Sequence, residues 1–367
     1  MITFKTYKYK LYNREYKELD EILDLSSWVY NHCIALHRRY YRMYKKSLNK
    51  FKLQKHLTKL KQTERFKDWN KVPSQAVQDI TDRIQRAYKL FYSNLKSGKK
   101  TSHPHFQKRT KYHSFTTKQA GYKLLDGNKI KIGSKIYSYF KSRDIVGEIK
   151  TLTLKRTIRG YYIYLVVEQE QVVYKAVTTG KSVGFDFGMK TFLTASDGNN
   201  INIPQFLKLN LDKMKRLSKL FSKGKRGSQT SLNKLHEKIA NQRKDLHWKL
   251  AHSLTDMYDL IVFETLDLTS MLKHCQKKIH DFGFGSFLSI LQYIAKQKGK
   301  VVHFVDKYFP SSKTCSECGW KNVDLKLSDR IFECQGCGLV RDRDFNASIN
   351  IHREGTSSLN FGTLGCL

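Results

Sequence analysis

Residues 183–188 read Val-Gly-Phe-Asp-Phe-Gly, and this stretch decides the fold of the C-terminal half of the chain. It combines an apolar run of strand length with a single carboxylate, Asp186. Residues 191–195 (Thr-Phe-Leu-Thr-Ala) follow, and then a Ser-Asp-Gly-Asn turn at 196–199. We therefore expect a β-hairpin here, and a new αβ segment that begins near Ser182.

Two further acids occupy comparable places in the sequence. Residues 260–263 (Leu-Ile-Val-Phe) form another apolar strand that ends in Glu264, and Asp344 lies in the acidic start of a helix over 341–351. A carboxylate near the end of a core strand is costly unless it binds a cation or a partner. Three acids that converge from two strands and a helix N-terminus would suit two Mg²⁺ or Mn²⁺ ions. Such ions activate a water and stabilise the leaving oxygen in phosphodiester hydrolysis.

Each acid taken alone also has a simpler interpretation. Asp344 could be only a helix N-cap, and Glu264 only a strand-end residue. Residues 186–188 (Asp-Phe-Gly) match the metal-binding tripeptide of protein kinases, but neither a Gly-rich loop nor a His-Arg-Asp loop precedes them. Residues 180–182 (Gly-Lys-Ser) lack the earlier glycine of a phosphate-binding P-loop, because Lys175 stands in its place.

Four of the seven cysteines form two close pairs near the C-terminus: Cys315, Cys318, Cys334 and Cys337. Each pair is separated by two residues and is followed by a glycine, where a tight knuckle turn is expected. This spacing predicts a tetrahedral zinc site of four thiolates, which is structural because it leaves no open ligand position. The other three, Cys33, Cys275 and Cys366, are scattered, which favours reduced thiols over a disulfide framework.

The chain carries a large positive charge along most of its length. Its 367 residues include 68 Lys+Arg against 32 Asp+Glu, a formal net charge of +36. A surface with that excess repels itself unless a polyanion neutralises it, so nucleic acid is the first interpretation and an acidic membrane surface the second. The 40% hydrophobic and 13% aromatic content excludes a disordered basic tail.

The N-terminal half changes its pattern twice. Residues 2–12 alternate apolar or aromatic with basic residues, as a half-exposed strand does. The period becomes helical over about 15–96, and residues 112–170 again predict strands. If the first strand pairs with the later ones, the β-unit could be a small barrel into which the helical block is inserted.

Basic and aromatic residues are interleaved within the helical block. Residues 38–71 contain thirteen Lys/Arg and two acids, with six aromatic residues among them, which suits backbone contact plus base stacking. The alternative is that these aromatic residues only fill the helix core. The candidate nucleic-acid contacts are Arg38, Arg39, Arg42, Lys45 and Lys46, together with Arg243 and Lys244 in a later basic helical segment.

Nothing in the sequence predicts a membrane protein. No stretch approaches the roughly 20 apolar residues that span a bilayer. The first residues, Met1 to Lys5, also lack the apolar core and cleavage site of a signal peptide. We therefore expect an intracellular, cytoplasmic protein without a membrane partner.

The segments around the three acids and the cysteine pairs resemble those of the TnpB family, transposon-encoded relatives of type V CRISPR effectors. Three segments resemble the RuvC motifs in order, one resembles the basic helical segment between the first two, and one resembles the lead-in to a zinc ribbon. They are 184–190, 261–268, 341–347, 236–245 and 309–315, respectively. In the third motif the second aspartate is the family's metal ligand, which implies Asp344 and not Asp342.

The resemblance implies a multidomain α/β protein built around an RNase H-like (RuvC) nuclease domain. Its implied divisions are a wedge β-barrel at 1–13 and 100–178, a helical recognition domain at 14–99, the RuvC domain at 179–310 and 340–355, an inserted zinc ribbon at 311–339 and a tail at 356–367. All three acids are present, so relatives that have lost one or more of them are a poorer match.

The implied activity is RNA-guided cleavage of double-stranded DNA. The guide RNA comes from the transposon end, pairing supplies most of the sequence reading, and a single RuvC site cuts both strands beside a short motif. The implied assembly is a monomer with one RNA. Two other hypotheses stay open: a DNA-binding protein, guide-dependent or guide-free, that does not cleave, and a guide-free resolvase or transposase on the same fold.

Overall fold

The computed structural model describes residues 2–118, 121–170, 178–188, 190–265, 281–326 and 328–359. The chain divides into two compact units, Met1–Gln171 and Val172–Leu367. Several predicted positions lie outside the described residues: Met189, residues 266–268 of the second motif, Cys275, Cys366 and the tail beyond Leu359. Each unit has its own buried core.

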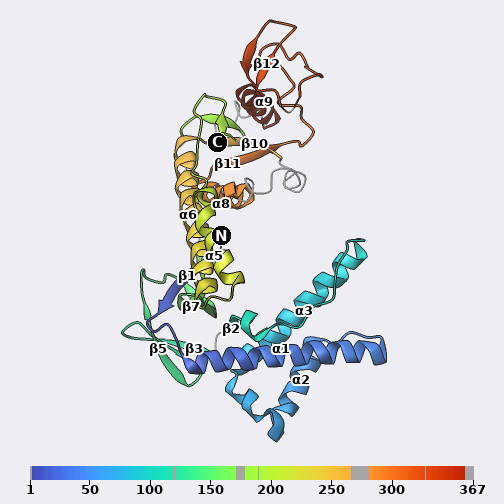
Figure 1. Ribbon diagram of the computed structural model, residues 1–367, viewed down its shortest axis with the longest axis vertical. Coiled ribbons are helices and arrows are strands. Elements are labelled where there is room, and N and C mark those ends of the chain that lie inside the picture. Colours follow the sequence, from blue (N-terminus) through green and yellow to red (C-terminus); the bar gives the residue numbers. More distant parts are fainter. Residues whose placement is uncertain are drawn as a thin grey trace. The chain divides into compact units, whose positions relative to one another are not determined.

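A seven-stranded antiparallel sheet organises unit 1 (Figure 1). Its strands are β1 (Ile2–Leu11), β2 (Ser114–Lys118), β3 (Tyr122–Leu125), β4 (Lys129–Ile132), β5 (Lys135–Phe140), β6 (Glu148–Thr157) and β7 (Gly160–Glu170). They lie in the order β2-β6-β7-β1-β5-β4-β3, so the first strand pairs with β7 on one side and β5 on the other. The expected pairing of residues 2–12 with the later strands is therefore present, in a nearly closed barrel.

The helices of unit 1 all come between β1 and β2 in the sequence. They are α1 (Lys17–Tyr44), α2 (Lys50–Leu60), the 3₁₀ segment Glu64–Lys71 and α3 (Ser74–Lys96), with a 3₁₀ turn at Arg109–Lys111 before β2. α1 and α3 bury apolar residues at helical spacing, such as Leu19 and Leu23 of α1. No described helix of the chain is both long and apolar enough to cross a membrane.

A smaller sheet forms the centre of unit 2. It consists of β8 (Ser182–Asp186), β9 (Thr194–Ala195), β10 (Leu260–Glu264) and β11 (Val301–Val305), in the order β11-β10-β8-β9. β8, β10 and β11 are parallel, whereas β9 returns antiparallel to β8 and confirms the predicted hairpin. The helices are α4 (Phe206–Leu209), α5 (Leu211–Ser222), α6 (Ser228–Met257), α8 (Phe284–Lys298) and α9 (Arg343–Ser358).

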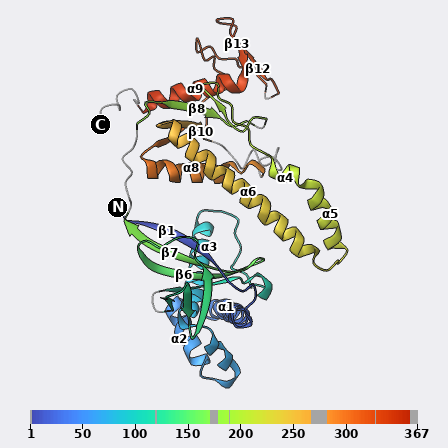
Figure 2. The ribbon, with the colours of Figure 1, turned by 90° about the vertical axis from the view of Figure 1, so that its left-hand side faces the viewer.

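Helices cover both faces of this sheet (Figure 2). Alternate strand residues point to opposite faces. Val183, Phe185, Ile261 and Phe263 therefore pack with residues of α6 and α8, while Leu260 and Val262 pack with Ile351 of α9. A parallel sheet covered on both faces explains why β8 and β10 are nearly continuous apolar runs.

α9 lies directly on the backbone of β8 because the residue beneath it is a glycine. A Cβ atom built on Gly184 would lie 2.6 Å from the carbonyl oxygen of Ser348 and 2.5 Å from the backbone nitrogen of His352. Neither contact is possible for a real side chain. Gly184 therefore allows the C-terminal helix to approach the strand that carries Asp186.

The segment between β11 and α9 contains a small two-stranded ribbon. Its strands are β12 (Ile331–Glu333) and β13 (Val340–Asp342), paired antiparallel with Phe332 opposite Arg341. The core here is minimal: Phe332 packs with Cys315 and Cys334. So small a core needs a further stabilising element, which the cysteines described below can supply.

Candidate active site and metal centre

Asp186 and Glu264 lie at the ends of neighbouring parallel strands and point to the same face of the sheet. The register pairs Gly184 with Val262 and Phe185 with Phe263, so the next position along the ladder brings Asp186 opposite Glu264. Both acids follow the alternation that directs Gly184 and Val262 toward α9. Adjacent strands lie about 4.8 Å apart, so the two carboxylates share one edge beside α9.

Asp344 is in the first turn of α9 and does not cap that helix. The N-cap is Asp342, whose carboxylate accepts hydrogen bonds from the backbone N–H groups of Asp344 and Phe345, both at 3.0 Å. The simpler interpretation of Asp344 as an N-cap is therefore wrong. The first aspartate of the motif is the N-cap, so the carboxylate of the second, Asp344, is not used to cap the helix.

The three carboxylates interact through their charges. Burial raises the pKa of Asp186 well above its usual range, and the negative charges of Glu264 and Asp344 raise it further, while Arg343 opposes this. Burial and the charge of Asp344 likewise raise the pKa of Glu264. Carboxylates that repel one another in a buried place favour a bound cation, and oxygen donors are what Mg²⁺ prefers. The donor set thus fits divalent cations.

Two arginines pair with Asp344. The Arg343 guanidinium lies 3.2 Å from one carboxylate oxygen, and the Arg330 guanidinium, from the segment before β12, lies 3.6 Å from the other. The three acids are not gathered as tightly as the cysteines, which form the one metal-ligand cluster within 4.8 Å found among the described residues. The two arginines place positive charge beside Asp344, and Arg343 also opposes the raised pKa of Asp186.

We expect Mg²⁺ to stabilise the protein in a pH-dependent way. Because Asp186 and Glu264 have raised pKa values, they bind protons more tightly folded than unfolded, so metal-free stability falls as pH rises from about 4 through those raised values. At pH values above those raised pKa values, bound Mg²⁺ should offset the repulsion between the carboxylates and restore the lost stability. The melting temperature should rise with Mg²⁺ by about 2–4 °C at pH 7.5 and by less at pH 5.5.

Asp186→Asn provides the comparison for that experiment. It removes one of the repelling charges, so its metal-free melting temperature at pH 7.5 should exceed that of the wild type and should respond little to Mg²⁺. Scanning calorimetry with and without chelator measures both. An equal Mg²⁺ response in the two proteins would contradict a cation site at Asp186.

The four cysteines have the geometry of a zinc site. Their sulfur atoms all lie within 4.8 Å of one another, with Sγ–Sγ distances of 3.7 Å for Cys315–Cys337 and 3.5 Å for Cys318–Cys334. A tetrahedron with Zn–S bonds of about 2.3 Å has edges of about 3.8 Å. Gly319 and Gly338 have φ values of +76° and +74°, as the predicted knuckle turns require. The predicted structural zinc site is thus supported by geometry.

Two buried asparagines of α9 tie the first zinc knuckle to the helix. Asn346 accepts a hydrogen bond from the backbone N–H of Ser316 at 2.9 Å and donates to the carbonyl of Thr314 at 2.7 Å. Asn350, one turn later, donates to the carbonyls of Ser311 and Thr314. This role was not predicted from the sequence, although two asparagines four residues apart on one apolar helix face are a detectable signal.

Asn346→Ala should destabilise unit 2 by about 1–3 kcal/mol, because it leaves the buried Ser316 N–H without an acceptor and leaves the Thr314 carbonyl with Asn350 as its remaining donor. Urea unfolding measures the loss. Asn346→Asp retains an acceptor for Ser316 but no donor for Thr314, so it should fall between wild type and alanine at neutral pH. A wild-type midpoint for the alanine variant would exclude this tie as a stabilising contact.

The predicted contacts at the end of α1 differ in their surroundings. Arg39, Arg42, Lys45 and Lys46 are exposed. Arg38 is half-buried: its guanidinium donates to the carbonyl of Pro104 at 2.8 Å and lies over the ring of Phe106. The aromatic residues of this region divide in the same way. Trp69 belongs to the core, whereas Tyr41, Tyr44 and Phe51 are exposed by 43, 56 and 66%, respectively.

The two candidates on α6 also differ. Lys244 is exposed, but Arg243 is half-buried and donates to the backbone carbonyl of Asp281 at 3.4 Å. One helical turn further on, His247 is fully buried and hydrogen-bonds to the carbonyl of Phe282 at 2.9 Å. Arg243 therefore helps to hold the chain before α8.

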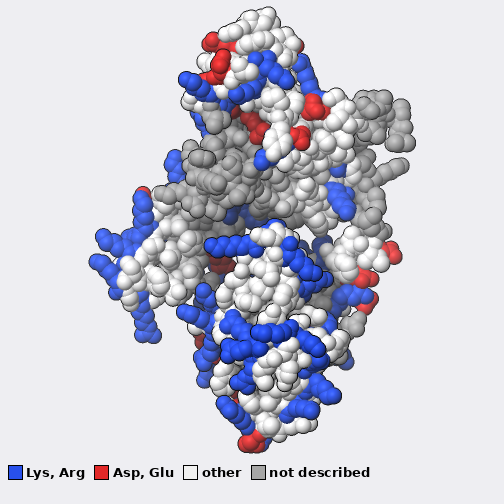
Figure 3. Space-filling view, turned by 90° about the vertical axis from the view of Figure 1, so that its right-hand side faces the viewer, with Lys and Arg blue, Asp and Glu red and all other residues white. Residues whose placement is uncertain are grey.

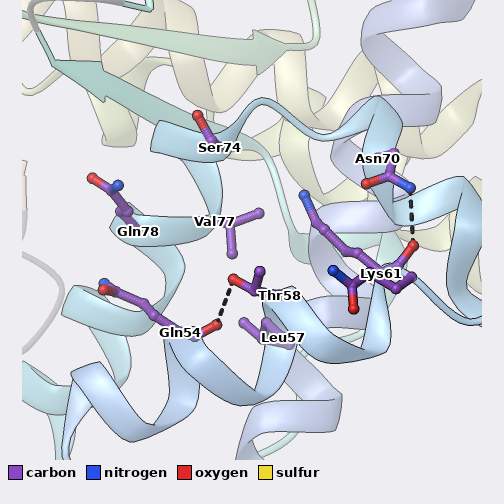
Figure 4. Close-up of a pocket in the computed structure, with 9 residues that line it drawn as sticks. Gln54, Leu57, Thr58, Lys61, Asn70, Ser74, Val77 and Gln78 are labelled. Atoms are coloured by element: carbon purple, nitrogen blue, oxygen red, sulfur yellow. Dashed lines mark hydrogen bonds between the residues drawn. The ribbon is translucent and has the colours of Figure 1, made fainter.

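A hollow between α2 and α3 was not foreseen from the sequence (Figure 4). It measures about 650 Å³ and is lined mainly by amide and hydroxyl side chains: Gln54, Leu57, Thr58, Lys61, Gln62, Asn70, Ser74, Val77 and Gln78. Lys61, its one cation, donates to the carbonyl of Val72 at 3.3 Å, and burial lowers its pKa. Its amide side chains come from α2, the residues after α2, the 3₁₀ segment and α3, so the surface forms only when these elements pack together.

Two family models match the chain. The model for OrfB_IS605, described as "Probable transposase", matches residues 164–274, and the Cas12f1-like TNB domain model matches residues 284–351. The second match covers α8, β11, the zinc ribbon and the start of α9, including Asp344. The first covers β8 and β10, with Asp186 and Glu264.

One relative that matches over most of its length, a second that matches in part and a solved structure agree with these family matches. A Streptomyces pristinaespiralis protein, provisionally named an RNA-guided DNA endonuclease, is 24% identical over 96% of this chain and 90% of its own length. The TnpB-like protein L770 of Acanthamoeba polyphaga mimivirus is 30% identical over 58% of this chain and 45% of its own. The fold is similar to that of Cas12f1, solved in complex with its guide RNA and target DNA, with a TM-score of 0.57, 16% identity and coverage of 92% of this chain and 83% of that one. Together with the motifs in the sequence, these matches show that the chain is similar to the TnpB-like proteins.

Proposed function

We propose that this protein is an RNA-guided DNA endonuclease that cleaves target DNA at the edge formed by Asp186, Glu264 and Asp344. The supporting observation is that two strand ends and one helix start bring three mutually repelling carboxylates to one edge of an RNase H-like sheet. The relatives' names and the likeness to Cas12f1 support the same activity.

Each residue has a defined part in this proposal. Asp186, Glu264 and Asp344 would hold two Mg²⁺ or Mn²⁺ ions, which supply an activated water and stabilise the leaving oxygen. Arg330 has a side chain that is 57% exposed and places a positive charge beside Asp344, where it suits a phosphate of the bound strand. Asp342 keeps α9 capped, which fixes the direction of Asp344.

The proposal extends to the domains. We propose that unit 1 contains the wedge barrel (1–13 and 100–178) and the helical recognition domain (14–99), and that unit 2 contains the RuvC domain (179–310 and 340–355) with the zinc ribbon (311–339). The division at Gln171–Val172 supports the boundary between the first pair and the second. The partners would be one guide RNA from the transposon end and double-stranded DNA, bound to a monomer.

Sequencing the RNA that copurifies with the protein tests the guided mechanism directly. A single abundant species with a variable 3′ or 5′ segment would identify a guide, and DNA matching that segment should be cut in Mg²⁺. Random RNA fragments together with unguided cutting would favour a resolvase or transposase. A defined RNA with DNA binding but no cutting in Mg²⁺ or Mn²⁺ would favour a binding protein.

The exposed basic residues at the C-terminal end of α1 and just after it should contribute to nucleic-acid affinity. Replacing Arg39, Arg42, Lys45 and Lys46 by glutamine should reduce the slope of log affinity against log salt by about 1–3, because fewer counterions are released. Filter binding from 50 to 300 mM salt measures this slope. An unchanged slope would mean that this face is solvated in the complex.

A further inference from the structure

A long, strongly basic helical hairpin projects from unit 2. It consists of α5, the turn 223–227 and the first half of α6, and we call residues 211–242 the basic hairpin. Residues 213–238 contain nine exposed cations and one acid, Glu237. The cations are Lys213, Lys215, Arg216, Lys219, Lys223, Lys225, Arg226, Lys234 and Lys238. In Figure 3 the projection stands at the left of the view, with lysine and arginine side chains along its outline.

Within the part of the chain that the structure describes, little negative charge balances the basic hairpin. Among the described residues its nine cations make one ion pair, Lys215 with Asp212 at 3.6 Å. Lys215 and Lys219, and again Lys234 and Lys238, are four residues apart on a helix, where like charges repel. A bound polyanion would remove that repulsion, so the complementary partner is a row of phosphates.

The turn at the tip is rigidly built. Gly224 has a φ of +71° and closes α5, where the backbone N–H of Lys225 donates to the carbonyl of Leu220 at 3.1 Å. Gly227, with a φ of +78°, precedes α6. The tip cations Lys223, Lys225 and Arg226 are therefore presented on fixed backbone, which reduces the entropy lost when they bind.

The basic hairpin extends beyond the edge that carries the acids. α6 ends just before β10 begins, so it runs antiparallel to β10, and its N-terminal part lies toward the strand end with Glu264. His247 marks the level of that edge, since its ring stacks on Phe192, which follows β8, and its Nε2 bonds the Phe282 carbonyl just before α8. The nineteen residues of α6 that precede His247 extend past this level by roughly 28 Å at 1.5 Å per residue.

We propose that the basic hairpin binds the sugar–phosphate backbone of the target DNA and guides it to the edge of the sheet that carries Asp186 and Glu264. Its length matches about eight nucleotide steps at 3.4 Å each. Seven of its nine cations are lysines, which act as point charges on phosphates and read no bases. DNA is the partner favoured over RNA because the strand to be cut must reach Asp186 and Glu264. This inference rests on the proposed nuclease function.

The test compares two triple variants that remove the same charge. One changes the tip (Lys223→Gln, Lys225→Gln, Arg226→Gln), and the control changes the exposed lysines of the β3–β4 hairpin (Lys123→Gln, Lys129→Gln, Lys131→Gln). Each is purified with its copurifying RNA and carries Asp186→Ala, so that DNA is bound without being cut. The tip variant should bind target DNA about 10- to 100-fold more weakly at 150 mM salt, with its salt slope lowered by about 1–3 and its RNA content unchanged.

Three results would overturn this inference. They are equal losses in the tip and control variants, a wild-type salt slope in the tip variant, and a loss of bound RNA in place of DNA affinity. Thermal melting identifies a tip variant that fails to fold, and the double change Lys219→Gln with Lys234→Gln on the helix faces then replaces it. Cleavage by the protein with Asp186 intact is measured separately, so a failure of the nuclease proposal is distinguishable from a failure of the hairpin.

Discussion

Asp186→Ala should reduce guide-dependent DNA cleavage at least about a thousandfold while leaving guide and DNA binding intact. Burial and the charges of Glu264 and Asp344 raise the pKa of Asp186 well above its usual range. Removing it would remove a ligand shared by the proposed cations, and a thousandfold loss corresponds to about 4 kcal/mol of barrier at 1.36 kcal/mol per tenfold. Single-turnover cleavage of a labelled target in Mg²⁺ measures the rate.

Asp342→Asn is the matched control for this experiment. It changes an acid two residues from Asp344, but asparagine retains the side-chain oxygen that accepts the two N-cap hydrogen bonds. Cleavage should therefore stay within a few-fold of wild type. Undiminished cutting by Asp186→Ala, or equal losses in both variants, would show that the chemistry lies elsewhere.

Cys334→Ser should release zinc and unfold the ribbon. Cys334 is buried, its sulfur lies 3.5 Å from that of Cys318, and it adjoins the small core around Phe332. Structural zinc contributes on the order of 10 kcal/mol to the folding of small zinc domains, far more than this core can replace. Because the ribbon carries Arg330 and its first knuckle is bonded to Asn346, cleavage should fall as well.

Zinc content by plasma mass spectrometry and limited proteolysis together measure the effect of Cys334→Ser. The variant should contain much less than one zinc per chain and should be cut within residues 311–342, where the wild type resists. Cys33→Ala is the comparison, since Cys33 is a buried thiol in the core of unit 1 and should leave the zinc content unchanged. One full equivalent of zinc in the Cys334 variant would rule out the four-thiolate site.

The sequence predicted those parts of unit 2 in which chemistry leaves a local pattern. An apolar run ending in an acid marks both β8 and β10, and the cysteine spacing marks the zinc ligands, so Asp186, Glu264 and the four thiolates could be chosen without coordinates. Alternation alone also places Asp186 on the face of Gly184, and Glu264 on the face of Val262. In unit 1 the alternation of apolar and basic residues predicted the first strand, and the structure pairs that strand with the later ones.

The rest depends on contacts between residues far apart in the chain. Asp342, and not Asp344, caps α9. The two acids are two residues apart, and the sequence at the start of the helix does not show which of them is the cap. Arg38 and Arg243 look like solvated cations in the sequence, yet each donates to a distant backbone carbonyl. The basic hairpin extends past the strand ends because the long helix α6 packs antiparallel to β10, which has five residues. The charge pattern alone does not predict this extension.

The contact between Gly184 and α9 has a consequence for incomplete chains. Asp186 and Glu264 come well before Asp344 in the chain, and Asp344 lies on α9. At Gly184, α9 packs directly on the backbone of β8 with no side chain between them. A polypeptide that stops or is clipped before Arg343 would retain its lysine-rich surfaces but hold only two of its three acids. It would also leave Leu260 and Val262 of the central sheet uncovered, so we expect unit 2 to form its proposed site only once α9 is in place.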